Sequence, residues 1–295
     1  MFKENTDLVR VPQKKTQTSQ QSKIEMKGPP GMGNFIFSRI RLAFAVIVFF
    51  GLMTIIVSAE DVKPTIDPHA DALLKRMGDF LAQAQFFSVN AEIWQDVQLH
   101  SGQQVQAGRV VDLQVRRPNR FHSEVRSSRR NRGLYYDGTS VTLLDRVQNL
   151  YGSIPAPASL EEALDVASER FGIVIPLEDL IASDSYQNTI RNATSGIDIG
   201  PVTVLGVPCE HLAFSQGAVD WQVWIEDGAM PVPRKIVITY KDEEGSPEYT
   251  AILSHWDFQT KLPDFVFICE PPIGAAKIDV AEIKNENKND KCEGK

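Results

Sequence analysis

The stretch that most constrains this chain is residues 105–121, which read VQAGRVVDLQVRRPNRF. As a β-strand it would alternate between two faces, because successive side chains of a strand point in opposite directions. Val111, Leu113 and Val115 share an apolar face, and the other face is mostly polar. Pro118 has no backbone donor and is expected to end the strand. The pattern therefore predicts a long strand with one face on an apolar core.

Arg117 falls on the apolar face of that strand, at its last position. Two interpretations of this charge are open. An arginine stem commonly lies along apolar surface at a strand end while the guanidinium reaches water. Alternatively, the apolar face lines a cavity and Arg117 holds a segment over its mouth, because a guanidinium carries five donors in a rigid plane.

A helix and a second strand precede this stretch. Asp67 is expected to cap a helix that has Pro68 at its first position, and apolar residues at helical spacing continue it to Ala84. Alternation then predicts a strand over residues 87–99, which turns back into the strand that begins near residue 105. The apolar face of this second strand carries Phe87, Val89, Ala91 and Ile93.

Short strands with tight turns are predicted for residues 121–151, which is typical of an antiparallel meander. Strands resume near Ile190, and the last one is predicted at residues 265–270. The chain should therefore be mainly β, of the α+β class. It should form a half-open antiparallel β-barrel of about 10–11 strands, with an N-terminal helix and a mid-chain helical lid.

Two helices are predicted to interrupt the meander. Ser159 and Glu162 form a capping box for a helix that continues to about residue 171, and a second short helix covers residues 177–182. Their apolar residues, Leu164 and Leu180 among them, have to pack on a face of the sheet or across its open end. We expect these helices to form a lid.

The N-terminal region resembles an export signal. Arg39 and Arg41 precede an apolar run that ends in small residues, which predicts a secretory signal peptide over residues 32–59 with cleavage after Ala59. An uncleaved membrane anchor is the alternative, because the run is nearly long enough to span a bilayer. The remaining segments are expected to be a disordered extension or a region before the true start at Met32 (1–31), a linker (60–66), the half-barrel domain (67–282) and a disordered tail (283–295).

The formal charge of the chain is −7, and residues 60–295 carry 23 basic and 35 acidic side chains. That balance argues against nucleic acid as a partner, because binding to nucleic acid requires neutralisation of phosphates. Eight arginines nevertheless lie between Arg109 and Arg132. They form either a solvated face or a docking surface for anionic lipid or an acidic partner.

The chain offers little for catalysis. Its five histidines are far apart in sequence and match no metal-binding spacing, and no nucleotide-binding loop is present, so we expect no enzyme, no cofactor and no metal site. A hydrolase that uses Cys209 and His211 is the weakest alternative, because side chains two apart on a strand are about 7 Å apart. Cys209 could form a disulfide with Cys269 if their strands are neighbours.

The ordered elements resemble the Lol-type (LolA/LolB-like) periplasmic lipoprotein carriers, and more closely the uncharacterised predicted periplasmic proteins grouped with them. The resemblance covers residues 67–280. It rests on the leading helix, the long hairpin that ends in Arg117, Pro118, Asn119 and Phe121, the Asp137-Gly138 turn, and the late Phe-x-Phe and Pro-Pro-x-Gly motifs. The residue directly after Ala59 is Glu60 and not a cysteine, so the lipid-anchored receptor of that system is not the model for this chain.

The resemblance implies a half-barrel with helices as a lid over an apolar cavity that receives acyl chains. It also implies that Arg117 hydrogen-bonds to the lid and holds it shut. We expect a periplasmic carrier or chaperone for lipid or lipoprotein acyl chains, aided by an inner-membrane or envelope partner. The alternative is an envelope sensor or interaction protein on the same fold that acts through its surface; an uncleaved anchor would favour it, because a carrier must diffuse.

Overall fold

The computed structural model describes residues 65–173, 175 and 177–281. The predicted extension, signal or anchor, and tail lie outside these residues. Among the described residues, no helix is both long enough and apolar enough to cross a membrane. The strands are β1 (Phe86–Gln98), β2 (Gln104–Arg116), β3 (Arg120–Arg126), β4 (Asn131–Tyr136), β5 (Ser140–Asp145), β6 (Leu150–Pro155), β7 (Ser195–Val204), β8 (Val207–Gln216), β9 (Val219–Glu226), β10 (Pro233–Tyr240), β11 (Glu248–Asp257) and β12 (Ala276–Lys277). The helices are α1 (Pro68–Gln83), α2 (Leu160–Asp165), the π-helix η1 (Val166–Arg170), α3 (Glu178–Ile181), α4 (Ser185–Ile190) and the 3-10 helix η2 (Asp264–Phe267).

The strands form one open sheet in the order β12-β6-β5-β4-β3-β2-β1-β11-β10-β9-β8-β7. Strands β1 to β6 make one antiparallel meander and β7 to β11 make a second, which returns to pair β11 with β1. The two-residue strand β12 pairs with β6 in parallel. Strands β7 and β12 are the two edges, so the sheet does not close, and the prediction of a half-open, mainly antiparallel fold is confirmed.

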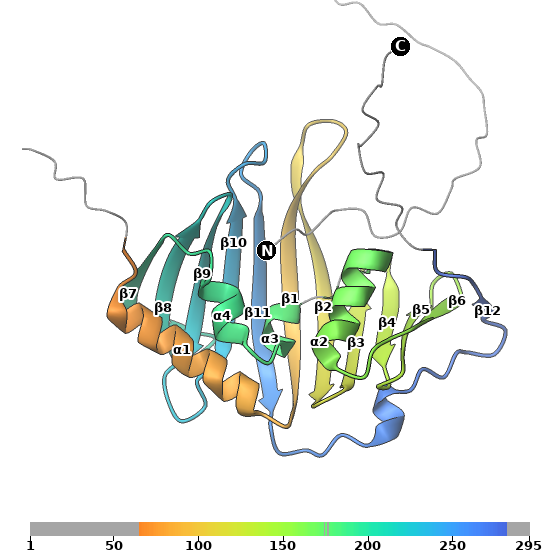
Figure 1. Ribbon diagram of the computed structural model, residues 1–295. Coiled ribbons are helices and arrows are strands. Elements are labelled where there is room, and N and C mark those ends of the chain that lie inside the picture. The colour runs from red at the N-terminus through yellow and green to blue at the C-terminus, as the bar shows by residue number, and fades with distance from the viewer. Residues whose placement is uncertain (1–64, 174, 176, 282–295) are drawn as a thin grey trace, which may run out of the picture. The chain divides into compact units, whose positions relative to one another are not determined.

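The helices α1 to α4 lie against the same face of the sheet (Figure 1). We call this the inner face; it carries Val111, Leu113 and Val115, which belong to one buried core with residues of the helices. The predicted cap of α1 is confirmed, because the side chain of Asp67 accepts a hydrogen bond from the backbone N–H of His69. The predicted long hairpin is confirmed as β1 and β2.

Two details of the prediction are wrong. Residues 265–270 do not form a strand: η2 occupies their start, and Phe267 is buried with the guanidinium of Arg116 5.1 Å from the centre of its ring. A third lid helix, α4, ends at Ile190, where a strand was predicted. The predicted number of about 10–11 strands agrees with β1 to β11, each of six residues or more, and the two-residue β12 is a twelfth.

Candidate functional site

The predicted ligand residues of the long hairpin all lie together on the inner face. In the register of β1 and β2, Phe87 pairs with Val115, Val89 with Leu113, and Ala91 with Val111. Each of these side chains, and that of Ile93, exposes at most 2% of its surface. The residues are therefore adjacent as predicted, but they are packed rather than exposed to a cavity.

Leu164 and Leu180 of the mid-chain helices belong to the same buried core as the hairpin. We call residues 156–194, which connect β6 to β7, the lid. Leu180 exposes 3% of its surface and Leu164 7%, so little space remains beside them. A ligand could reach the inner face only if the lid moved.

The topology explains why the lid crosses the inner face. Strand β6 lies ten strand steps from β7 in the sheet order, which is about 48 Å at 4.8 Å per step. The lid therefore bridges the two meanders across the face that carries the core (Figure 1). It cannot be removed without breaking the connection between them.

The lid is built from short helices. Helices α2 and α4 have six residues each and α3 has four, and Leu177 before α3 has a left-handed φ of 59°. Isolated helices of this length are not stable in water. The lid therefore depends on its packing against the inner face, and we expect it to open more readily than the strands separate.

Arg117 lies at the junction between the sheet and the lid. Its Nη2 donates to the backbone oxygen of Ala182 at 3.4 Å, and its Nε is buried without a hydrogen-bond partner among the described residues. Burial lowers the pKa of this guanidinium, and the charge of Glu161 opposes that shift. Arg117 thus contacts the lid, and its role in holding the lid shut stays a prediction.

Glu161 of α2 was not recognised from the sequence. Its Oε1 accepts from the backbone N–H of Ser183 at 2.6 Å, and this hydrogen bonding and Arg117 lower the pKa of its carboxyl group. Glu161 thus connects the first lid helix to the segment that follows α3, while Arg117 contacts the neighbouring residue, Ala182. An exposed glutamate at the start of a helix gives no sign of this role.

Tyr136 and Tyr186 attach other parts of the lid. The Tyr136 hydroxyl donates to the backbone oxygen of Pro157 at 2.5 Å, and the Tyr186 hydroxyl donates to Asp71 Oδ1 at 2.6 Å, which links α4 to α1. The hydrogen bond with Asp71 raises the pKa of Tyr186 to about 12. Neither tyrosine was predicted, because each contact joins segments that are far apart in the chain or separated by a turn.

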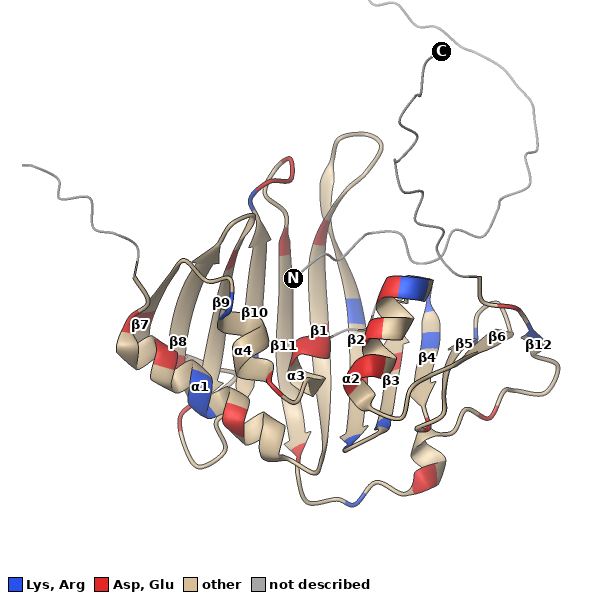
Figure 2. Cartoon of the chain, viewed as in Figure 1, with Lys and Arg blue, Asp and Glu red and all other residues tan. Residues whose placement is uncertain are grey.

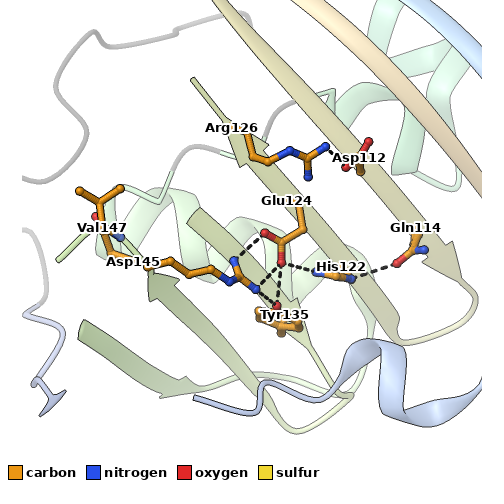
Figure 3. A network of polar contacts seen from close by, with 9 residues as sticks. Asp112, Gln114, His122, Glu124, Arg126, Tyr135, Asp145 and Val147 are labelled. Carbon is orange, nitrogen blue, oxygen red and sulfur yellow. Dashed lines mark hydrogen bonds and ion pairs between the residues drawn. The ribbon is translucent and has the colours of Figure 1, made fainter. Parts of the chain in front are cut away.

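A polar network lies on the opposite, outer face of β3 to β5 (Figure 3). Glu124 accepts hydrogen bonds from Tyr135 and Arg146 at 2.6–2.7 Å, and His122 Nε2 lies 3.0 Å from its carboxylate. Burial alone would raise the pKa of Glu124, but the hydrogen bonds and the charge of Arg146 lower it to about 2. The carboxylate is saturated with partners, so we interpret the network as structural.

Replacement of Glu124 by Gln is expected to lower the free energy of unfolding by about 1 kcal/mol at neutral pH, because the amide places donors against Arg146. The depressed pKa of Glu124 stabilises the fold above its ordinary value of 4.5, and this contribution is lost as the pH falls toward 2. Urea denaturation at pH 7 and pH 3 should therefore show a smaller difference between variant and wild type at pH 3. Asp112→Asn, which removes the more exposed ion pair with Arg126, is the control and should cost less at pH 7.

Cys209 and His211 do not act on each other in the structure. Cys209 is buried, its Sγ donates to the backbone oxygen of Val207 at 3.4 Å, and burial raises the pKa of the thiol. His211 Nε2 faces Gln222 Oε1 at 3.0 Å, and its ring stacks on Trp224. Within the described part of the chain, no group of three or more His, Cys, Asp or Glu residues is placed to hold a metal ion.

The disulfide between Cys209 and Cys269 is not formed; both are free thiols. Cys209 lies in β8, whereas Cys269 follows η2 and is near enough to Arg146 and Glu124 for their charges to affect its pKa. Six strand steps separate β8 from β3, about 29 Å along the sheet. A disulfide requires Cα atoms within about 7 Å, so the two cysteines cannot meet.

Comparison with known proteins identifies a family. A family model described as "Predicted periplasmic protein (DUF2092)" matches residues 70–281. This match confirms the predicted resemblance to uncharacterised periplasmic proteins and the predicted location. The comparison with curated proteins gives no match.

Several solved structures are similar at low identity. An uncharacterised conserved protein from Thermus thermophilus has 12% identity, a TM-score of 0.41, and coverage of 72% of this chain and 99% of its own. The Mycobacterium tuberculosis lipoprotein LppX has 14% identity, a TM-score of 0.42, and coverage of 67% and 100%. A LolA superfamily protein from Nitrosomonas europaea has 10% identity, a TM-score of 0.35, and coverage of 68% and 97%.

Proposed function

Because the chain belongs to the DUF2092 family of predicted periplasmic proteins, we propose that it binds the acyl chains of a lipid or lipoprotein between the inner face and the lid. One observation carries this proposal. The continuous apolar inner face of the sheet is covered by helices, namely α1 and the short helices of the lid, instead of by a second sheet. Displacement of the lid would expose an apolar surface suited to acyl chains. Such a protein would serve as a carrier or chaperone for hydrophobic molecules.

The energetics of burial are compatible with an exchange between lid and ligand. Each methylene transferred from water contributes about 0.8 kcal/mol, so an acyl chain of about ten methylenes offers about 8 kcal/mol. That free energy has to offset the packing that the lid residues, such as Leu180 and Ile181, lose on opening. The ligand would then shift a closed–open equilibrium toward the open state.

The proposal is tested by native mass spectrometry and lipid extraction on the protein purified from the envelope of bacteria that express the full chain. Copurification of a phospholipid, fatty acid or acylated peptide at a fixed stoichiometry is expected. A bare protein mass, together with no uptake of a fluorescent fatty acid, would contradict the proposal. In that case the lid would stay packed on the inner face and leave no room for a ligand.

Replacement of Arg117 by Leu is expected to leave the fold intact and to tighten the binding of a fluorescent fatty acid about fivefold, because the lost contact stabilises the closed lid, with which the ligand competes. The variant loses the donor to Ala182 and the charge that faces Glu161, and a net loss of about 1 kcal/mol corresponds to that factor. Equilibrium titration with the fluorescent fatty acid measures the effect.

Arg116→Leu is the matched control. Arg116 Nη1 donates to the backbone oxygen of Leu262 at 2.6 Å and the side chain pairs with Asp264, so it holds the C-terminal segment rather than the lid. The affinity of this control for the fatty acid should stay close to that of the wild type. Equal affinities of Arg117→Leu and wild type would show that Arg117 does not hold the lid.

A further inference from the structure

Arginines lie at one end of the apolar inner face of β2, β3 and β4. Arg109 precedes Val111 by two residues and therefore shares its face, and Val111 pairs with Val125, which pairs in turn with Arg132. Arg130 precedes Arg132 by two residues, and its backbone oxygen accepts from Ser127 in the β3–β4 turn. We call Arg109, Arg130 and Arg132 the arginine rim.

The rim lies at the end of the inner face opposite Arg117. Along β2 the side chains on the inner face are, in order, Arg109, Val111, Leu113 and Val115. Arg117, which contacts the lid, follows directly after the end of β2. Figure 2 shows basic positions on both β2 and β4. The inner face is therefore charged at the arginine rim and apolar beyond it, as an amphiphile has a charged headgroup followed by an apolar chain.

The guanidiniums of the rim are close enough to repel one another. Burial lowers the pKa of Arg130, and the positive charges of Arg132 and Arg109 lower it further, while Asp145 opposes them. Arg132 Nε donates to Asp145 Oδ2 at 2.8 Å, and Arg109 Nη1 donates to Gln95 Oε1 at 3.1 Å. Asp145 thus pairs with Arg132, and its charge also acts on Arg130.

Arg132 adds a second observation. Its side chain exposes only 17% of its surface, and its Nη1 is buried without a hydrogen-bond partner among the described residues. A buried donor on a charged group is costly when it has no acceptor. A phosphate group suits such a place, because it offers several acceptor oxygens to the planar donors of arginine.

We propose that the arginine rim binds the phosphate headgroup of an anionic lipid whose acyl chains lie beneath the lid. This inference rests on the proposed function and names the class of ligand. The headgroup would contact Arg130 and Arg132, while the first methylenes would meet Val111 and Val125. The rim would then select phosphate-bearing amphiphiles over neutral ones.

The test compares three probes on the protein purified from cells that express the full chain: dihexanoyl phosphatidic acid, dihexanoylglycerol and inorganic phosphate. Phosphatidic acid is expected to bind at least about tenfold more tightly than the neutral lipid, because charge-assisted hydrogen bonds add to the same apolar burial. Inorganic phosphate should bind more weakly than either lipid. Higher salt should reduce the preference for the anionic lipid.

The variants Arg130→Glu and Arg109→Gln/Arg130→Gln should remove most of the tenfold preference without weakening the binding of dihexanoylglycerol. Arg126→Gln/Arg129→Gln is the matched control on the same hairpin. Arg126 pairs with Asp112 on the outer face (Figure 3). Arg129 is exposed. Circular dichroism establishes that each variant is folded. If Arg109→Gln/Arg130→Gln does not fold, the comparison of Arg130→Glu with the wild type is sufficient.

Each outcome has a distinct meaning. Equal affinities of wild-type protein for phosphatidic acid and dihexanoylglycerol would overturn the rim inference and leave the proposed function standing. Inorganic phosphate that binds as tightly as phosphatidic acid would show a site for free anion and would also overturn it. No binding of either lipid would overturn the proposed function and the rim inference together.

Discussion

Replacement of Ile181 by Arg is expected to open the lid while the sheet stays folded. Ile181 is fully buried in α3 against the inner face, and an unpaired charge at such a position costs about 3–5 kcal/mol. The four-residue helix α3 has little stability of its own, so the lid should detach rather than carry the charge inside. The apolar inner face would then be exposed to solvent.

Hydrogen exchange measures this opening. Amides of residues 178–191 should lose protection by a factor of about 100 or more, which corresponds to about 3 kcal/mol or more, while amides of β1 and β2 keep theirs. Gln187→Arg, an exposed position on α4, adds the same charge to the lid and should change neither region. Simultaneous loss of protection in the lid and in β1 and β2 would show that the lid does not open as a separate unit.

Replacement of Gly78 by Ala is expected to destabilise the protein by about 2 kcal/mol, because the new methyl group overpacks the contact between α1 and α4. A Cβ at this position would lie 2.7 Å from Tyr186 Cβ and 2.9 Å from the Tyr186 backbone nitrogen. Helix propensity alone would give the opposite sign, a gain of about 1 kcal/mol for alanine over glycine. Urea denaturation measures the change in the free energy of unfolding.

Ala72→Gly on the exposed side of α1 is the control for propensity and should cost about 1 kcal/mol. Hydrogen exchange should show that Gly78→Ala lowers the protection of amides in α4 more than in the remainder of the lid, because Tyr186 makes the contact between α4 and α1. A gain in stability for Gly78→Ala would mean that α4 moves aside at no cost.

The fold could be predicted from the sequence where local signals agree with tertiary packing. Alternation over residues 105–121 gave the correct inner face of β2 and placed Arg117 on that face, whereas its contact with the lid was implied only by the resemblance. Helix α4 was missed because the sequence SYQNTI favours no helix; its formation depends on the Asp184 cap and on the packing of Tyr186 against Gly78. Residues 265–269 form a short apolar run, as a buried strand would, but the structure places η2 there and packs Phe267 against Arg116.

The candidate site was only partly predictable. The apolar residues of the hairpin follow from alternation, but their packing beneath the lid does not, since filled and hollow barrels show the same pattern. The arginine rim requires the register between β2, β3 and β4, which brings Arg109 near Arg132. The contact of Glu161 with Ser183 requires the path of the lid, which no local signal gives.

The most direct test of the account is photo-crosslinking with a fatty acid that carries a diazirine in its chain, followed by mapping of the labelled residues. We expect labels on the inner face, at positions such as Val111 and Leu113, and on the underside of the lid at Leu180. An excess of unlabelled fatty acid should remove them. Labels confined to the outer face, or no saturable labelling, would contradict the binding of acyl chains beneath the lid.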